Sequence, residues 1–208
     1  MTPRDRLPLT LLAVVAGFFV WSGIHPHDRF TWFLEIVPLL VAVPILLGTY
    51  RRFRLSSLTC ILITLHAVIL MVGGHYTYAE VPLFNWIRDH FHLHRNEYDH
   101  LGHFAQGFVP AIIAREILLR MRVLRRGAWL FFLVVCICLS ISLLYELFEW
   151  AVAIFTGTSA AAFLGGQGDP WDTQKDMAWA LAGALFAMST MQRLHDYSLS
   201  ALGISPSE

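Results

Sequence analysis

The sequence predicts an all-α integral membrane protein, a single domain over residues 1–208 with six transmembrane helices and both termini in the cytoplasm. Six apolar stretches are each close to the length that crosses a bilayer as a helix, about 20 residues. Charged residues make up only 14% of the chain and hydrophobic residues 56%, whereas soluble domains are about 25% charged. Basic residues also gather in alternate loops, which is the pattern that orients membrane proteins.

The first half of the chain contains three predicted spans. Residues 7–24 are apolar and lack a small-x-small cleavage site, so we expect a retained helix rather than a cleaved secretion signal. Residues 32–49 form the second span, in which Pro38 and Pro44 predict kinks. Residues 57–74 form the third.

The second half contains three more, at residues 99–119, 129–150 and 170–191. In the long loop 75–98 that precedes them, the segment PLFNWIRDHF has the spacing of a short amphipathic helix lying at the membrane surface. The small and glycine-rich stretch 156–169 predicts a flexible loop.

The sixth span has a recognisable start. Asp169 followed by Pro170 predicts a helix N-cap with proline at the first helical position, which puts Asp172 at the third. Beyond its end, the chain after Arg193 predicts only a short polar tail.

Charge placement predicts the orientation. Of the 15 lysines and arginines, 11 fall on the side of the termini, which is therefore cytoplasmic. The opposite side receives 11 of the 15 acids and eight of the ten histidines. Its four basic residues are Arg29, Arg88, Arg95 and Lys175.

Two classes of function find no support in the composition. A net charge of zero does not favour nucleic-acid binding. Cys60, Cys136 and Cys138 lie in apolar runs, and the last two point to nearly opposite sides of one helix, so we expect neither a disulfide nor a thiolate site.

The stretch NEYDHLGHFAQ at the start of the fourth span organises the rest of the chain. On a helix, Asp99, His103 and Gln106 share one face, and ionisable groups at the mouth of a membrane helix indicate a functional site. The predicted orientation brings two further segments to the same side of the membrane: YELFEW, with Glu146 and Glu149, and GDPWDTQKD, with Asp169, Asp172 and Asp176.

Carboxylates that share a site of low dielectric constant need a compensating cation, and a divalent metal is the simplest one. Oxygen and nitrogen donors without thiolate favour Zn, Mn or Fe over Mg. We expect His103, Glu146 and Asp176 to be catalytic, with His75 or Glu35 as a further possible ligand. The predicted metal ligands are Asp99, His103, Glu146, Glu149, Asp172 and Asp176.

Several of these residues have a purely structural interpretation as well. Asp169 and Asp172 suit helix capping, and Glu149 suits the lipid headgroup region. His66, in the middle of the third span, is expected to be a hydrogen-bonded residue between helices. Near the far end of the fourth span, the sequence predicts that Arg115 and Glu116 lie at the membrane interface, with Glu116 and Arg120 as a helical ion pair.

The segments NEYDHLGHFAQGFVP, AREILLR, LYELFEW and QGDPWDTQKDM, in this order between predicted spans, resemble the YjdF-like group of bacterial inner-membrane proteins. The resemblance covers essentially the whole chain. It implies a multi-pass protein of the bacterial inner membrane and carries no catalytic residue with it. A looser similarity is to VanZ-like membrane proteins, which also place Asp and His at the start of one span and acids on later ones.

Three functions fit this pattern. The first is a metal-dependent hydrolase or transferase at the outer, periplasmic face, acting on a lipid or lipid-linked substrate whose phosphate Arg88, Arg95 or Lys175 would hold. The second is a transporter or channel for protons or cations, which needs polar groups through the whole membrane depth. The third is a non-catalytic envelope scaffold, although interhelical polar pairs worth roughly 1–2 kcal/mol or less would be inefficient glue.

Overall fold

The computed structural model describes residues 6–157 and 161–204, and all regular structure in these ranges is helical. Each of the six predicted spans coincides with a long helix: α1 (Arg6–Gly23), α2 (Arg29–Thr49), α3 (Ser57–Tyr76), α5 (Tyr98–Arg120), α6 (Ala128–Thr156) and α8 (Asp172–Thr190). The shorter helices are η2 (Tyr78–Glu80), α4 (Pro82–Phe91), α7 (Ala161–Leu164) and α9 (Gln192–Ser200).

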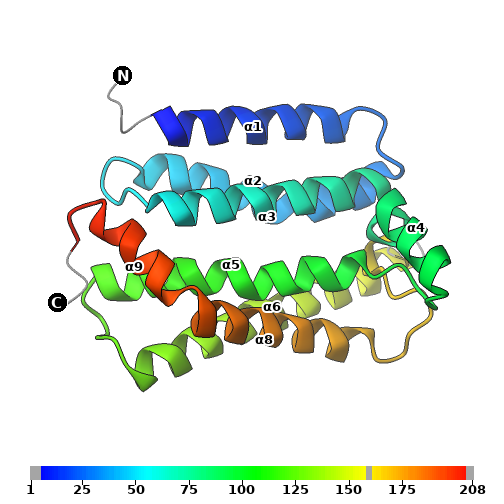
Figure 1. The fold of residues 1–208 in the computed structure, drawn as a ribbon. Coiled ribbons are helices and arrows are strands. Elements are labelled where there is room, and N and C mark those ends of the chain that lie inside the picture. The colour runs from blue at the N-terminus through cyan, green and yellow to red at the C-terminus, as the bar shows by residue number, and fades with distance from the viewer. Residues whose placement is uncertain (1–5, 158–160, 205–208) are drawn as a thin grey trace.

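The long helices run side by side, each antiparallel to the one before it (Figure 1). One group contains α1, α2 and α3, and the other contains α5, α6 and α8, with α3 packing against α5 to join them. The beginning of α1 and the whole of α9 lie at one end of the bundle, and α4 lies at the other (Figure 1). We refer to these as the α9 end and the α4 end.

Four of the described helices, α1, α2, α3 and α6, are long and apolar enough to cross a membrane. Their outward faces carry large apolar side chains, such as Val20 on α1 and Leu144 on α6, each more than 60% exposed. Such an exterior suits lipid rather than water. The ionisable residues buried on α5 and α8 include Asp99, His103 and Asp176. These two helices pack against each other more extensively than any other pair in the described chain.

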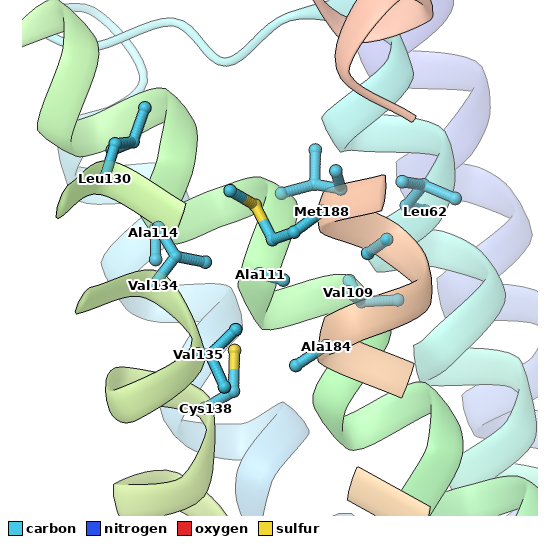
Figure 2. Packing of buried hydrophobic residues seen from close by; sticks show 12 residues of the cluster. Leu62, Val109, Ala111, Ala114, Leu130, Val134, Val135, Cys138, Ala184 and Met188 are labelled. Atoms are coloured by element: carbon cyan, nitrogen blue, oxygen red, sulfur yellow. The ribbon is translucent and has the colours of Figure 1, made fainter. Parts of the chain in front are cut away.

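The main apolar core fills the space between α5, α6 and α8, and α3 contributes Leu62 from the side (Figure 2). Val134 and Cys138 of α6 are fully buried in it, as are Ala184 and Met188 of α8. Small side chains at these positions let the helices approach closely, which is how helices associate where lipid supplies no hydrophobic drive. The three cysteines are free, as the sequence predicts.

Two glycines set the distance between α5 and α8. A Cβ atom at Gly107 would lie 1.8 Å from the carbonyl oxygen of Ala180, and one at Gly183 would lie 2.1 Å from that of Phe104. Backbone meets backbone at both points, so no larger residue fits without moving the helices. This contact fixes the start of α5 beside the first turns of α8.

The segment between α6 and α8 differs from the prediction. The stretch predicted as one flexible loop contains the short helix α7, although residues 158–160 lie outside the described part. The final long helix begins at Asp172 with Trp171 as its N-cap residue, so the predicted capping register is wrong. Asp169 instead closes the turn before the helix, where its Oδ1 accepts the Trp171 N–H at 2.9 Å.

The tail after Arg193 is not an isolated polar segment, because α9 folds back against α3 and α8 and buries His195 completely. Arg115 and Glu116, which we expected at the membrane interface, are also fully buried, and the predicted ion pair between Glu116 and Arg120 is present at 2.7 Å. Opposite charges and hydrogen bonds within the cluster compensate for this burial.

Glu116 is the centre of this cluster, which we call the Glu116 network. One carboxylate oxygen accepts the Ser56 N–H at 2.8 Å in addition to Arg120. The other accepts the Thr59 hydroxyl at 2.6 Å and lies 3.1 Å from Nε2 of His195. The network thus ties α3, α5 and α9 together at the α9 end.

Candidate functional site

Three buried side chains meet at the α4 end of the bundle. Asp99 and His103 occupy the first two turns of α5 on one face, and Asp176 projects from the second turn of α8. One ligand atom from each lies within 4.8 Å of the others, and none of the three residues is more than 7% exposed. The spacing of four residues on α5 and the close α5–α8 contact together produce this arrangement.

The two nitrogens of the His103 ring face different partners. Nε2 lies 3.5 Å from Oδ1 of Asp99 and 3.9 Å from Oδ2 of Asp176. Nδ1 lies 3.7 Å from Oε1 of Glu146 and 3.3 Å from Oε1 of Gln106. Glu146 is therefore placed behind the ring, where a carboxylate orients a metal-binding histidine and increases its basicity.

Two buried oxygens in this cluster have no hydrogen-bond partner, Oδ1 of Asp176 and Oε1 of Glu146. Their residues are 2% and 5% exposed, so these oxygens have little contact with bulk solvent. Oδ1 of Asp176 lies 3.9 Å from Nε2 of His100, which also has no partner, and Oε1 of Glu146 faces Nδ1 of His103. Carboxylates that share a buried site are costly without a compensating charge, and a cation between Asp99, His103 and Asp176 would supply that charge. The donor set of two carboxylates and an imidazole fits a divalent transition metal.

A guanidinium group sits on the other side of Asp99. Arg95, just before α5, forms a close ion pair with Asp172, contacts Asp99 at 3.3 Å and lies 3.7 Å from Asp169. Burial opposes the charge on Arg95, yet the hydrogen bond to Asp172 and the nearby carboxylates hold the pKa of Arg95 above its ordinary value. The structure places the predicted ligand Asp172 against this arginine.

Asp169 also binds the Lys175 ammonium group, and that hydrogen bond lowers the pKa of Asp169 below its usual range. Arg88 pairs with Asp89 at 2.8 Å. Arg88, Arg95 and Lys175, the three residues proposed from sequence to hold a phosphate, thus each contact a carboxylate of this chain.

A cavity of about 610 Å³ opens beside Asp99 and His103. Its polar end also includes Glu35 and Glu149, and the Tyr145 hydroxyl donates to Glu35 at 3.4 Å. From there it extends between α2, α3, α5 and α6 along mainly apolar walls, with His66 part of the way along. The structure therefore places the predicted ligand Glu149, and the possible ligand Glu35, at the edge of the cavity.

His75, the other possible ligand, lies elsewhere. Its Nδ1 is 3.1 Å from the carbonyl oxygen of Ser22, and its ring packs against Trp21 with the ring centres 4.4 Å apart. It joins the ends of α1 and α3 and is not part of the cluster around His103.

Residues 7–197 match a family model described as "Predicted membrane protein (DUF2238)". This chain belongs to the DUF2238 family. It is 48% identical over 200 residues to the inner membrane protein YjdF of Escherichia coli (strain K12), a match that covers 96% of this chain and 93% of that protein. No solved structure matches the chain. The comparisons confirm the resemblance seen in the sequence, and this DUF2238 protein is a protein of the bacterial inner membrane.

One support of the site in this DUF2238 protein could not be predicted from the sequence. Asn96 is fully buried, and its backbone N–H donates to Oε1 of Gln167 at 2.9 Å. Its carbonyl oxygen accepts a hydrogen bond from Nε2 of Gln167, also at 2.9 Å. This reciprocal pair holds the segment before α8 against the start of α5. The amide residues in NEYDH and GGQGD were the only sequence signal, and nothing in their spacing pairs them.

Proposed function

We propose that this protein is a metal-dependent hydrolase or transferase whose site opens at the outer, periplasmic face of the inner membrane and acts on a lipid or lipid-linked substrate. The observation that carries the proposal is the grouping of Asp99, His103 and Asp176, together with the unpartnered buried oxygens of Asp176 and Glu146. Buried ionisable groups that lie close together beside a cavity are a usual feature of a reactive site.

The side chains have distinct roles in this proposal. Asp99, His103 and Asp176 would hold the metal, which would supply an activated water molecule when bound. Glu146 positions the imidazole of His103 through Nδ1, and Arg95 fixes the Asp99 carboxylate through its second oxygen. Oδ1 of Asp176, which has no hydrogen-bond partner, would be available to accept a proton from that water.

The proposal includes six spans in a single domain with cytoplasmic termini. Support comes from the six antiparallel long helices and from the arginine-rich loops at the α9 end, which include Arg51, Arg52, Arg122 and Arg125. The α4 end, with the acidic cluster, would then face the periplasm.

Cysteine labelling tests this orientation. We expect Asp89→Cys, at the α4 end, to react with an impermeant maleimide in intact spheroplasts, and Val123→Cys, at the α9 end, to react only after lysis. Both positions are exposed, and the variants are made after replacement of the three native cysteines. Labelling of Val123→Cys in sealed spheroplasts would contradict the orientation.

Elemental analysis tests the metal. We expect the purified protein to contain about one equivalent of Zn, Mn or Fe, because the donor set suits these ions. Chelation should remove the metal and lower the melting temperature, since a ligand that binds only the folded state stabilises it. Metal-free protein that remains metal-free after incubation with each of the three ions would refute the proposal.

Proton or cation transport is the second candidate, because the Glu116 network places buried ionisable groups at the α9 end as well. That network is closed by its own hydrogen bonds, however, and the cavity walls towards it are apolar, including Ile63 and Ile113. A continuous pathway needs polar groups along its length, so the geometry favours a one-sided site. A scaffold role would leave the unpartnered oxygens of Asp176 and Glu146 without a purpose.

A further inference from the structure

The cavity beside His103 has the form of a channel that runs along the helices. On α2 its lining extends from Glu35 to Leu46, roughly 16 Å at 1.5 Å per residue. On α5 the lining extends from Asp99 to Ile113, which is roughly 21 Å. The cavity is therefore deeper than one leaflet of a hydrocarbon core about 30 Å thick.

One side of this cavity faces the bilayer. It is flanked by α2 and α6, which make little backbone contact with each other in the described chain. At the α4 end, the short helix α7 packs against both of them. The flanking side chains Val41 and Ile45 on α2 and Leu144 on α6 line the cavity and are more than half exposed. At the polar end, the hydrogen bond from Tyr145 to Glu35 joins the same two helices. A ligand would therefore enter from the side, between α2 and α6, at a level closer to the α9 end than the Tyr145–Glu35 hydrogen bond.

The two ends of the cavity suit ligand groups of different polarity. The deep end presents only hydrocarbon side chains such as Leu46 and Ile113, which a hydrocarbon chain would cover. The polar end presents the carboxyl groups of Glu35 and Glu149, whose oxygens accept hydrogen bonds in either protonation state. An amphiphile that fits both has a long chain and a headgroup that donates hydrogen bonds. A volume of about 610 Å³ is within the usual range for ligand pockets.

We infer that the cavity binds one hydrocarbon chain of a membrane lipid, which enters between α2 and α6 and places an amino- or hydroxyl-bearing headgroup beside Glu35, Glu149 and His103. This assigns the substrate class of the site: a lipid whose reacting bond lies at the junction of chain and headgroup. That assignment as substrate rests on the proposed function, whereas the binding of the lipid does not.

Photolabelling tests the inference. The full chain is reconstituted in nanodiscs with phosphatidylethanolamine that carries a diazirine at the end of one acyl chain. We expect labelled residues on the cavity walls of α2, α5 and α6, around Leu46 and Ile113. Ala42→Phe, which adds a ring inside the cavity, should abolish that labelling, and Ala178→Phe, on the exposed surface of α8, should leave it unchanged. If Ala42→Phe does not fold, Leu144→Trp narrows the entrance at an exposed position and should reduce labelling in the same way.

The headgroup is tested with phosphatidylcholine carrying the same chain, which has the phosphate but no N–H donor. We expect it to label the cavity at least about tenfold less, because a hydrogen bond to a charged group is worth roughly 1.5–3 kcal/mol. Equal labelling by the two lipids, labelling spread evenly over the outer surface, or labelling unchanged in Ala42→Phe would each overturn the inference. Cavity labelling of a protein that takes up none of the three metal ions would refute the enzyme proposal and leave lipid binding intact. A protein that binds stoichiometric metal but shows no cavity labelling would refute lipid binding in the cavity and leave the metal site intact.

Discussion

Asp176→Asn is expected to lose the bound metal while the protein still inserts and folds. Asparagine keeps the shape of the side chain but removes one of the two carboxylate charges that face Nε2 of His103. Substitution of a group that only supports a metal ligand costs about 10–100-fold in affinity, so loss of a charged ligand should cost at least about 100-fold. The measurements are metal content and melting temperature with and without chelator. His103→Gln should behave in the same way.

Two other aspartates provide controls for this experiment. Asp28 caps α2 by accepting the Thr31 N–H, a role that asparagine fills equally well, so Asp28→Asn should retain metal and stability. Asp172→Asn should also retain metal, because that carboxylate faces Arg95. Metal lost from Asp172→Asn would restore Asp172 to the ligand set, as the sequence suggested. Undiminished metal in Asp176→Asn would exclude the proposed site.

Glu116→Ala is expected to destabilise the fold by about 3–5 kcal/mol, the usual cost of breaking a buried ion pair by removing one partner. The change leaves the Ser56 N–H, the Thr59 hydroxyl and His195 without their acceptor. Unfolding in detergent can be followed by the fluorescence of the seven tryptophans. Glu116→Gln should lower the free energy of unfolding by less, because an amide oxygen still accepts some of these hydrogen bonds.

The matched control is Glu80→Ala. Glu80 is exposed, and its hydrogen bond to Asn85 at 3.1 Å is open to solvent. A surface change of this kind is usually within about 0.5 kcal/mol of neutral. If Glu116→Ala and Glu80→Ala unfold at the same temperature, the Glu116 network does not hold α9 in place.

Local sequence patterns predicted the helices well and the long-range contacts poorly. Apolar runs located the long helices because length and hydropathy are properties of a single segment. These patterns did not predict α9, because its sequence QRLHDYSLS is short and polar and the contact of His195 with Glu116 is a long-range one. The sequence placed Glu116 at the membrane interface for a related reason. One of its partners, the Thr59 hydroxyl, is 57 residues away in the chain, so local sequence does not reveal the buried contact.

The candidate site shows the same contrast between local patterns, which were predicted, and long-range contacts, which were not. Asp99 and His103 were paired from their spacing on one helix, and the predicted orientation brought Glu146 and Asp176 to them. No such rule links Arg95 with Asp172, which are 77 residues apart, so Arg95 was assigned to a substrate and Asp172 to a metal. The capping motif at Asp169 misled the analysis because the same side chain can close a turn before a helix.

The inward-facing charges of α5 and α8 have a consequence for how the protein is made. Arg115 and Glu116 lie near the end of α5 and are fully buried. Arg120, on the same helix, can pair with Glu116 as soon as α5 has been made, whereas Asp196, the partner of Arg115, leaves the ribosome some 80 residues later. A nascent chain that has only reached α6 therefore lacks both the partner of Arg115 and the Asp176 carboxylate beside His103. The site around His103 and the contacts of Arg115 are completed only when α8 and α9 have been synthesised.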